Sequence, residues 1–143
     1  DRNYEKKINK KMKAKSLFVA LSQKVRDHEV ILVDSFDIKT PKTKSAFTLL
    51  ANLAKAGFKK VDYKTGCRTL IVIPEKSDAI FKSFTNLKGA KVETALNLGV
   101  YDVMKYKYII IENPDQSIAT LAGRSETIKI KKSKASKALV MSK

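Results

Sequence analysis

The run Thr69-Leu70-Ile71-Val72-Ile73 consists of apolar and β-branched residues, and Pro74 ends it. Such a run is typical of a strand that is buried on both faces of a sheet. The same composition recurs in Val30 to Val33, again indicating a strand buried on both faces, and strongly in Tyr108 to Glu112. Val92 to Ala95 shows it more weakly. The sequence therefore predicts four short strands.

Segments with helical signals precede the first strand and separate the others. The first segment has apolar residues at amphipathic-helix spacing, namely Ala14, Leu17, Phe18, Leu21 and Val25. In the second, we place Thr40 as an N-cap before Pro41 at the first helical position, and Gly57 closes the helix. Ser77 can cap a third helix that ends near Gly89.

Two further helical segments flank the last strand. Val100, Val103 and Met104 indicate a short helical turn before it. After it, Asn113 and Pro114 provide an N-cap and a residue suited to the first helical position. Strands that alternate with helices need crossover connections, so we expect an α/β fold. The expected architecture is a three-layer α/β/α domain with a four-stranded parallel sheet, plus basic terminal arms.

The length of 143 residues fits one ordinary domain, and 43% hydrophobic residues suffice for one core. The single cysteine, Cys67, excludes an intramolecular disulfide and a cysteine-rich zinc site. No apolar run approaches the length of a membrane helix, so we expect a soluble protein without a membrane partner. The chain opens at Asp1 with a polar segment, which indicates no secretory signal.

Positive charge is concentrated at the two ends of the chain. The net charge is +16, with 30 Lys and Arg against 14 Asp and Glu. Residues 1–15 carry seven basic and two acidic side chains, and residues 124–143 carry seven and one. We therefore divide the chain into a basic extended arm (1–15), an α/β globular domain (16–123) and a Lys-rich tail (124–143). Such ends either bind a partner rich in phosphates or are merely solvated.

Motifs for catalysis are mostly absent. The five glycines are isolated, which excludes a phosphate-binding glycine-rich loop, and His28 is the only histidine. Asp34 and Asp37 follow the first predicted strand, where an acidic catalytic or Mg²⁺ site would lie, but a role in capping the following loop is favoured. We expect no catalytic residues, no metal, no cofactor and no small-molecule substrate.

Candidate nucleic-acid contacts come from three segments. In the opening segment, cations that can neutralise phosphates accompany an aromatic ring that can stack on a base. The candidates there are Arg2, Tyr4, Lys6, Lys7, Lys10, Lys11, Lys13 and Lys15. Lys42 and Lys44 stand at the start of the second predicted helix, as in an anion site, although an ordinary capped helix start explains them equally well. In the tail, only positive charge supports the assignment of four further candidates, which are Lys129, Lys131, Lys132 and Lys134.

Several segments, taken in order, resemble one known family. They are Tyr4 with Lys10-Lys11-Met12, then Val30 to Asp34, Thr40-Pro41-Lys42-Thr43-Lys44, Leu70 to Glu75, Asn86-Leu87, Asn97, Tyr101-Asp102-Val103-Met104 and Ile109 to Ile111. Their order and spacing closely resemble the bacterial-type large-subunit ribosomal protein L-four family. The resemblance covers about residues 2 to 121.

The resemblance implies binding of large-subunit rRNA, early in assembly, by a globular α/β domain and a long extended loop that reaches the nascent-peptide tunnel. The chain begins close to where that loop would return, which implies that the loop and the family's preceding part are absent. Matching positions imply that Arg2, Tyr4, Lys6, Lys10 and Lys11 form the base of the loop, with Lys42 and Lys44 as a further contact.

We therefore expect a non-enzymatic structural constituent of the large ribosomal subunit. Its partners would be large-subunit rRNA and neighbouring ribosomal proteins, on ribosomes of a bacterial cytoplasm or of an organelle. Two alternatives remain open at this point. One is a nucleotide-binding or phosphoryl-processing enzyme that uses Asp34 and Asp37. The other is a basic protein that coats DNA without sequence preference.

Overall fold

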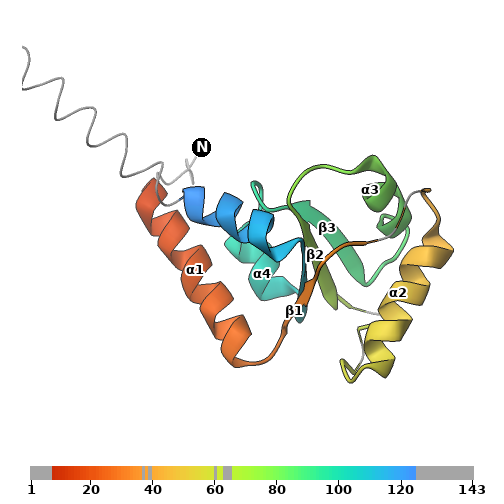
Figure 1. The fold of residues 1–143 in the computed structure, drawn as a ribbon. Coiled ribbons are helices and arrows are strands. Elements are labelled where there is room, and N and C mark those ends of the chain that lie inside the picture. The colour runs from red at the N-terminus through yellow and green to blue at the C-terminus, as the bar shows by residue number, and fades with distance from the viewer. Residues whose placement is uncertain (1–7, 37, 39, 60, 63–65, 125–143) are drawn as a thin grey trace, which may run out of the picture.

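The computed structural model describes residues 8–36, 38, 40–59, 61–62 and 66–124, and Figure 1 shows their arrangement. The elements are α1 (Lys10–Arg26), β1 (Val30–Val33), α2 (Thr43–Lys55), β2 (Thr69–Ile73), α3 (Asp78–Phe84), β3 (Ala90–Thr94), α4 (Val100–Lys105) and β4 (Tyr108–Glu112). A last helix, which we call the C-terminal helix, covers residues 114–124. The predicted α/β fold is confirmed.

The sheet has the strand order β1-β4-β2-β3, and every neighbouring pair is parallel. Strand β4 lies between β1 and β2, so Ile110 pairs with both Ile31 and Ile71. All five residues of β2 are buried. The predicted four-stranded parallel sheet is therefore present, and the last strand in the chain occupies a central position in it.

Side chains that alternate along the central strands build two cores. Ile71 and Ile73 belong to the core that α2 and α3 cover, whereas Leu70 and Val72 belong to the core that α1, α4 and the C-terminal helix cover. This alternation follows from the two-residue period of a strand. Figure 1 shows the two sets of helices on opposite faces of the sheet, which is the expected three-layer arrangement.

Strand β1 is not buried on both faces, and the prediction that it would be is wrong. It lies at the edge of the sheet, and its Leu32 is 57% exposed. Val25, predicted on the apolar face of the first helix, is also 59% exposed. Both residues line a pocket of about 560 Å³ that α1 and the C-terminal helix leave beside the sheet edge. Apolar composition alone does not distinguish an edge strand from a central one.

The start of α2 also differs from the prediction. The helix begins at Thr43, and its N-cap is Lys42 rather than Thr40, so Pro41 precedes the helix. The backbone N–H of Lys42 donates a hydrogen bond to Oγ of Ser83 in α3, at 3.1 Å. This contact with α3 is made by the N-cap residue Lys42 itself. The local sequence signal had instead indicated an N-cap two residues earlier, at Thr40.

The end of α2 is at the predicted place. Gly57 adopts a positive φ of 116°, which favours glycine because it has no Cβ. Its N–H bonds to the carbonyl of Ala54, and the N–H of Phe58 bonds to the carbonyl of Leu53. These two bonds form a Schellman motif and satisfy carbonyls at the end of the helix.

The other helix ends follow the sequence signals in part. Ser77 is the N-cap of α3, as predicted, although its hydroxyl makes no capping bond, and α3 ends at Phe84 rather than near Gly89. The C-terminal helix begins at Pro114, directly after Asn113, as predicted. Helix α1 begins at Lys10, so the boundary expected at residue 15 falls inside a helix. Among the described residues, no helix is both long enough and apolar enough to span a membrane.

Candidate nucleic-acid interface

Four of the predicted contact residues lie together on the first turns of α1. Lys10, Lys11, Lys13 and Lys15 are all exposed. Further along the same helix, Leu17 is 2% exposed and belongs to the core. The helix is thus held on the sheet by its middle, and its first turns present four ammonium groups to solvent. We call these four residues the α1 lysine cluster.

The α1 lysine cluster has no intramolecular counter-charge in the described residues. The ion pairs found there involve Lys24 and Lys91 and none of the four clustered lysines. The first turn of α1 holds no acidic residue, and its N-cap, Asn9, makes no side-chain capping bond. Because the N-terminal end of a helix carries a partial positive charge, cations there are unfavourable for the helix alone. The cluster therefore favours an external anion.

Lys42 and Lys44 form a second, separate group at the start of α2. Both are exposed, and the first turn of α2 contains no acidic residue. Because α2 packs on the opposite face of the sheet from α1, this group lies away from the α1 lysine cluster (Figure 1). The structure thus does not bring the two predicted basic groups into one site.

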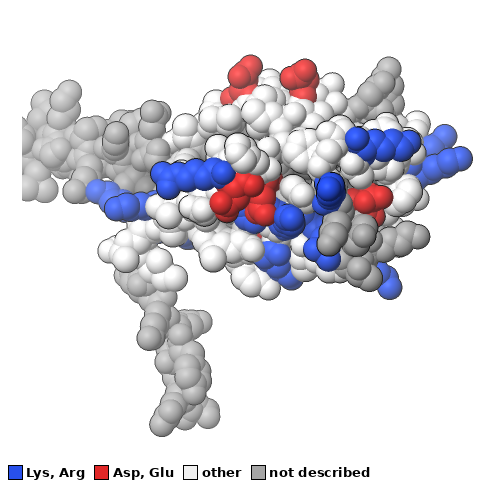
Figure 2. Space-filling model, turned by 90° about the horizontal axis from the view of Figure 1, so that it is seen from below, with Lys and Arg blue, Asp and Glu red and all other residues white. Residues whose placement is uncertain are grey.

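The remaining predicted contacts lie outside the described residues. They are Arg2, Tyr4, Lys6 and Lys7 near the start, and Lys129, Lys131, Lys132 and Lys134 near the end. On the face seen in Figure 2, Lys and Arg side chains are interspersed with acidic ones rather than forming one continuous basic patch.

Sequence reasoning missed one exposed aromatic residue beside a cation. Tyr101 in α4 is 72% exposed, and Nζ of Lys105 lies 5.3 Å from the centre of its ring. The neighbouring Tyr101 raises the pKa of Lys105 above its usual value. The four-residue spacing on a helix was the available signal. Residues 105–108 also alternate cations with aromatic rings, but Tyr106 and Tyr108 are both only 8% exposed.

The acidic residues at the strand ends do not form a catalytic cluster in the described part of the chain. Asp34 is exposed, and Oε1 of Glu112 accepts a hydrogen bond from the backbone N–H of Phe36 at 2.9 Å. Asp37 lies outside the described residues. No group of three His, Cys, Asp or Glu side chains suited to a metal ion occurs among the residues described. Glu112 therefore bonds to the backbone of Phe36 at the edge of the sheet where a catalytic site at the strand ends would lie.

The comparisons with known proteins all indicate the same family. Residues 1–123 match the Ribosomal protein L4/L1 family, so the match includes the opening basic segment and stops before the tail. "Large ribosomal subunit protein uL4" of Aquifex aeolicus is 39% identical over 112 residues, covering 78% of this chain and 52% of the relative. The proteins of that name from Thermoanaerobacter sp. and Mycoplasma capricolum are 40% and 35% identical over 110 and 111 residues.

These two alignments cover 77% and 78% of this chain, and 48% and 49% of the respective relatives. The chain thus spans about half the length of the curated relatives that it matches. The relatives are all named as proteins of the large ribosomal subunit, which agrees with the non-enzymatic ribosomal family expected from the sequence. The resemblance seen in the sequence motifs is therefore confirmed, and the chain belongs to the Ribosomal protein L4/L1 family.

Proposed function

We propose that this chain is a structural constituent of the large ribosomal subunit that binds large-subunit rRNA and supports its assembly. The observation that carries the proposal is the α1 lysine cluster, because four exposed cations at a helix N-terminus lack an intramolecular anion among the described residues. Phosphates of rRNA supply such an anion. Family membership supports the same assignment, since the relatives are named as large-subunit proteins.

In this proposal the α/β domain sets the geometry and the lysines neutralise phosphates. Leu17 and the other α1 residues that pack into the core hold α1 rigidly on the sheet. Lys10 and Lys11 therefore approach RNA from a fixed direction. Lys42 and Lys44 provide a second contact on the other face of the sheet. The predicted contacts near both ends of the chain, which lie outside the described residues, add further cations to the proposed binding. The other proposed partners are neighbouring ribosomal proteins, on the ribosome of a bacterium or organelle.

The test is binding of the chain to large-subunit rRNA fragments across a salt series. Each phosphate contact contributes about one unit to the slope of log affinity against log salt concentration. Lys10→Gln and Lys11→Gln are each expected to lower that slope by about one unit. Lys55→Gln is the matched control, because Lys55 is exposed in the last turn of α2, where a cation suits the helix end.

Selectivity separates the proposal from nonspecific binding. Retention of one rRNA fragment at physiological salt, against duplex DNA and unrelated structured RNA as competitors, is the expected result. An unchanged salt slope in both α1 variants would show that the cluster does not contact RNA. Equal loss of all three nucleic acids with rising salt would instead favour a basic protein that coats any nucleic acid.

A further inference from the structure

Arg124 fixes the end of the C-terminal helix. Its Nη1 donates hydrogen bonds to two backbone carbonyls, that of Leu98 at 2.8 Å and that of Ala95 at 3.3 Å. Both carbonyls belong to the connection between β3 and α4. Hydrogen bonds from a charged donor are stronger than those between neutral groups, so these two contacts hold the helix end firmly. The chain therefore leaves the described domain at a defined point, and the Lys-rich tail starts there.

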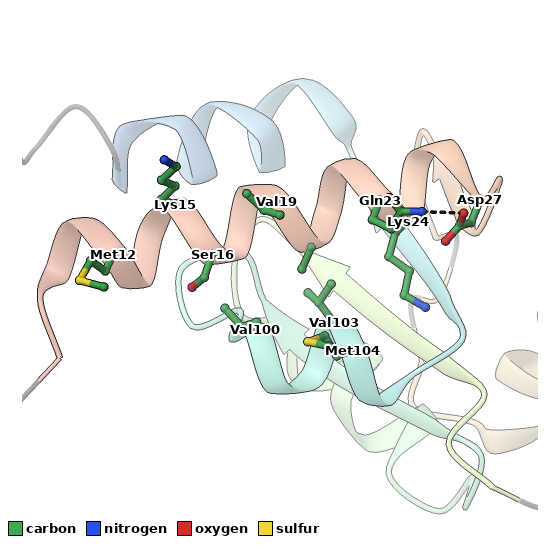
Figure 3. Close-up of a pocket in the computed structure, with 11 residues that line it drawn as sticks. Met12, Lys15, Ser16, Val19, Gln23, Lys24, Asp27, Val100, Val103 and Met104 are labelled. Carbon is green, nitrogen blue, oxygen red and sulfur yellow. Dashed lines mark hydrogen bonds between the residues drawn. The ribbon is translucent and has the colours of Figure 1, made fainter. Parts of the chain in front are cut away.

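This point lies beside the first turns of α1. Leu98 comes two residues before Val100, the first residue of α4, and Val100 lines the same pocket as Ser16 of α1. Figure 3 shows the side chains of Val100 and Ser16 next to each other. Contacts thus connect Arg124, through Leu98 and Val100, to the residue that follows the last member of the α1 lysine cluster.

The packing of the C-terminal helix agrees with this placement. Leu121, three residues before Arg124, is buried in the same core cluster as Leu98 and as Leu17 of α1. Figure 1 shows the end of the C-terminal helix and the start of α1 at the same end of the molecule, and Figure 3 shows the same arrangement in a closer view. The first and last parts of the described chain are therefore neighbours in space.

Covalent geometry limits how far the cations of the tail can lie from Arg124. Lys129 follows Arg124 by five residues, so its Cα lies within about 18 Å of the Cα of Arg124 even if the chain between them is fully extended. By the same limit, the Cα of Lys7 lies within about 11 Å of that of Lys10. Both basic ends of the chain therefore begin within reach of the α1 lysine cluster.

The gathering of like charges at this end of the molecule favours a shared polyanion. Among the neighbouring acidic groups, Asp102 lies beside Gly99 in the connection that Arg124 contacts, but it is already paired with Lys91 at 2.8 Å. In residues 124–143, one acidic side chain stands against seven basic ones. Cations held this close together repel one another unless an external anion neutralises them, and the successive phosphates of one RNA segment supply several negative charges at once.

The second basic group, Lys42 and Lys44, is less suited to act together with the tail. It lies at the start of α2, which packs on the opposite face of the sheet from α1. A tail that starts at Arg124 meets the α1 lysine cluster on its own side of the sheet. Lys42 and Lys44 are therefore expected to contact a different RNA segment.

We propose that Arg124 positions the Lys-rich tail beside the α1 lysine cluster, and that tail and cluster bind phosphates of the same rRNA segment as one site. The proposal rests on the rRNA binding proposed above and specifies how the contacts are arranged. Once one group of cations has bound, the other is present at a high effective concentration, so the two together bind more tightly than either alone. Arg124 acts as a positioning residue, since its guanidinium bonds to the protein.

The test separates the tail from the domain without removing any charge. A flexible Gly/Ser insert between Arg124 and Ser125 lengthens the connection to Lys129 from about 5 to about 25 residues. Effective concentration falls roughly as the −3/2 power of the linker length, so the affinity for a large-subunit rRNA fragment is expected to fall about tenfold. Fluorescence anisotropy of the labelled fragment at physiological salt measures this affinity.

The matched control carries the same insert after Lys143, which adds the same residues but leaves the connection to Lys129 unchanged. Its affinity is expected to stay within about twofold of that of the unmodified chain. An unchanged affinity with the insert after Arg124 would overturn the proposal. An increased affinity would also overturn it, because the tail would then bind an RNA segment that lies far from the cluster.

Substitutions of Arg124 test the positioning itself. Arg124→Gln removes the charged donor and is expected to lower the affinity for the rRNA fragment by at least about threefold, whereas Arg124→Lys keeps a charged donor and is expected to retain most of it. In a chain with Lys131→Gln and Lys132→Gln, Arg124→Gln is expected to have little further effect, because the tail that it positions has lost cations. An equal loss in both backgrounds would contradict the positioning role.

Failure of this inference is distinguishable from failure of the proposed function. The salt slopes of Lys10→Gln and Lys11→Gln test whether the cluster contacts RNA, and they do not involve the tail. If those slopes fall as expected while the insert has no effect, the cluster binds rRNA without the tail, and the shared site alone is overturned. If the unmodified chain retains no rRNA fragment, the proposed function and the shared site are both overturned.

Discussion

The two helical layers differ in how completely they bury their apolar side chains. In the layer of α2 and α3, the one large hydrophobic residue that stays exposed among those described is Phe47, at 39%. The layer of α1, α4 and the C-terminal helix leaves six exposed. They are Met12, Val19, Val25, Tyr101, Met104 and Ile118, each more than half exposed. Both layers cover the same sheet, so the sheet does not explain the difference.

The difference indicates that the two helical layers have different roles in the protein. On the α2 and α3 side nearly all large apolar side chains are buried or partly buried, and the rings of Phe36 and Phe84 pack with their centres 6.1 Å apart. The other side holds the α1 lysine cluster, the pocket beside β1 and a groove of about 790 Å³ between α1 and α4. The following substitutions test whether the two layers contribute differently to the stability of the fold.

The largest effect is expected for Phe84→Ala. Phe84 is fully buried, and its removal leaves a cavity between α3 and the sheet, so we expect the free energy of unfolding to fall by about 3–5 kcal/mol. Met104→Ala, on the other layer, removes a side chain that is 71% exposed and is expected to change it by no more than about 0.5 kcal/mol. Urea unfolding measures both. Comparable losses in the two variants would remove the distinction between the layers.

An intermediate effect is expected for Ser83→Ala. The buried Oγ of Ser83 accepts the Lys42 N–H at 3.1 Å and donates to the carbonyl of Ala79 at 2.7 Å. Loss of this bridge is expected to cost about 1–3 kcal/mol and to accelerate hydrogen exchange of the Lys42 amide. The control is Thr85→Ala, which removes an exposed hydroxyl bonded only within the helix. Unchanged exchange at Lys42 would mean that α3 does not hold the start of α2.

The smallest effect concerns an ion pair on the α4 side. Nζ of Lys91 lies 2.8 Å from Oδ1 of Asp102 and 3.4 Å from Oε2 of Glu93. The hydrogen bond to Asp102 raises the pKa of Lys91 above 10.5, although partial burial opposes it. Because the folded pKa is the higher one, the pair stabilises the protein below pH 10.5 and loses this contribution as pH rises through the folded pKa.

A double-mutant cycle with Lys91→Gln and Asp102→Asn isolates the pair. Since the Lys91 side chain is 38% exposed, solvent screening limits the coupling to the order of 0.5 kcal/mol at neutral pH. Thermal unfolding from neutral pH to about pH 11 is expected to show this coupling disappear at the alkaline end. A coupling that stays constant over that range would contradict the assignment to an ammonium–carboxylate pair.

Local sequence signals predicted the elements well and their surroundings less well. The end of α2 at Gly57 follows from the conformational freedom of a single residue, so it could be read directly. The start of α2 could not, because its N-cap Lys42 bonds to Ser83, which lies 41 residues further along the chain. The α1 lysine cluster was recognised by composition, but that its members lie on helical turns rather than in an extended arm required the structure.

The sequence by itself determined the fold class, the family and the residue types available for binding. These properties depend on local composition and periodicity, which each segment carries independently of its neighbours. The tertiary structure alone decided that β4 lies beside β1, that Leu32 therefore lies on an edge strand, and that Met12 and Met104 line one groove. These properties depend on which segments pack together. Packing is a relation between distant parts of the chain, and no short run of residues encodes it.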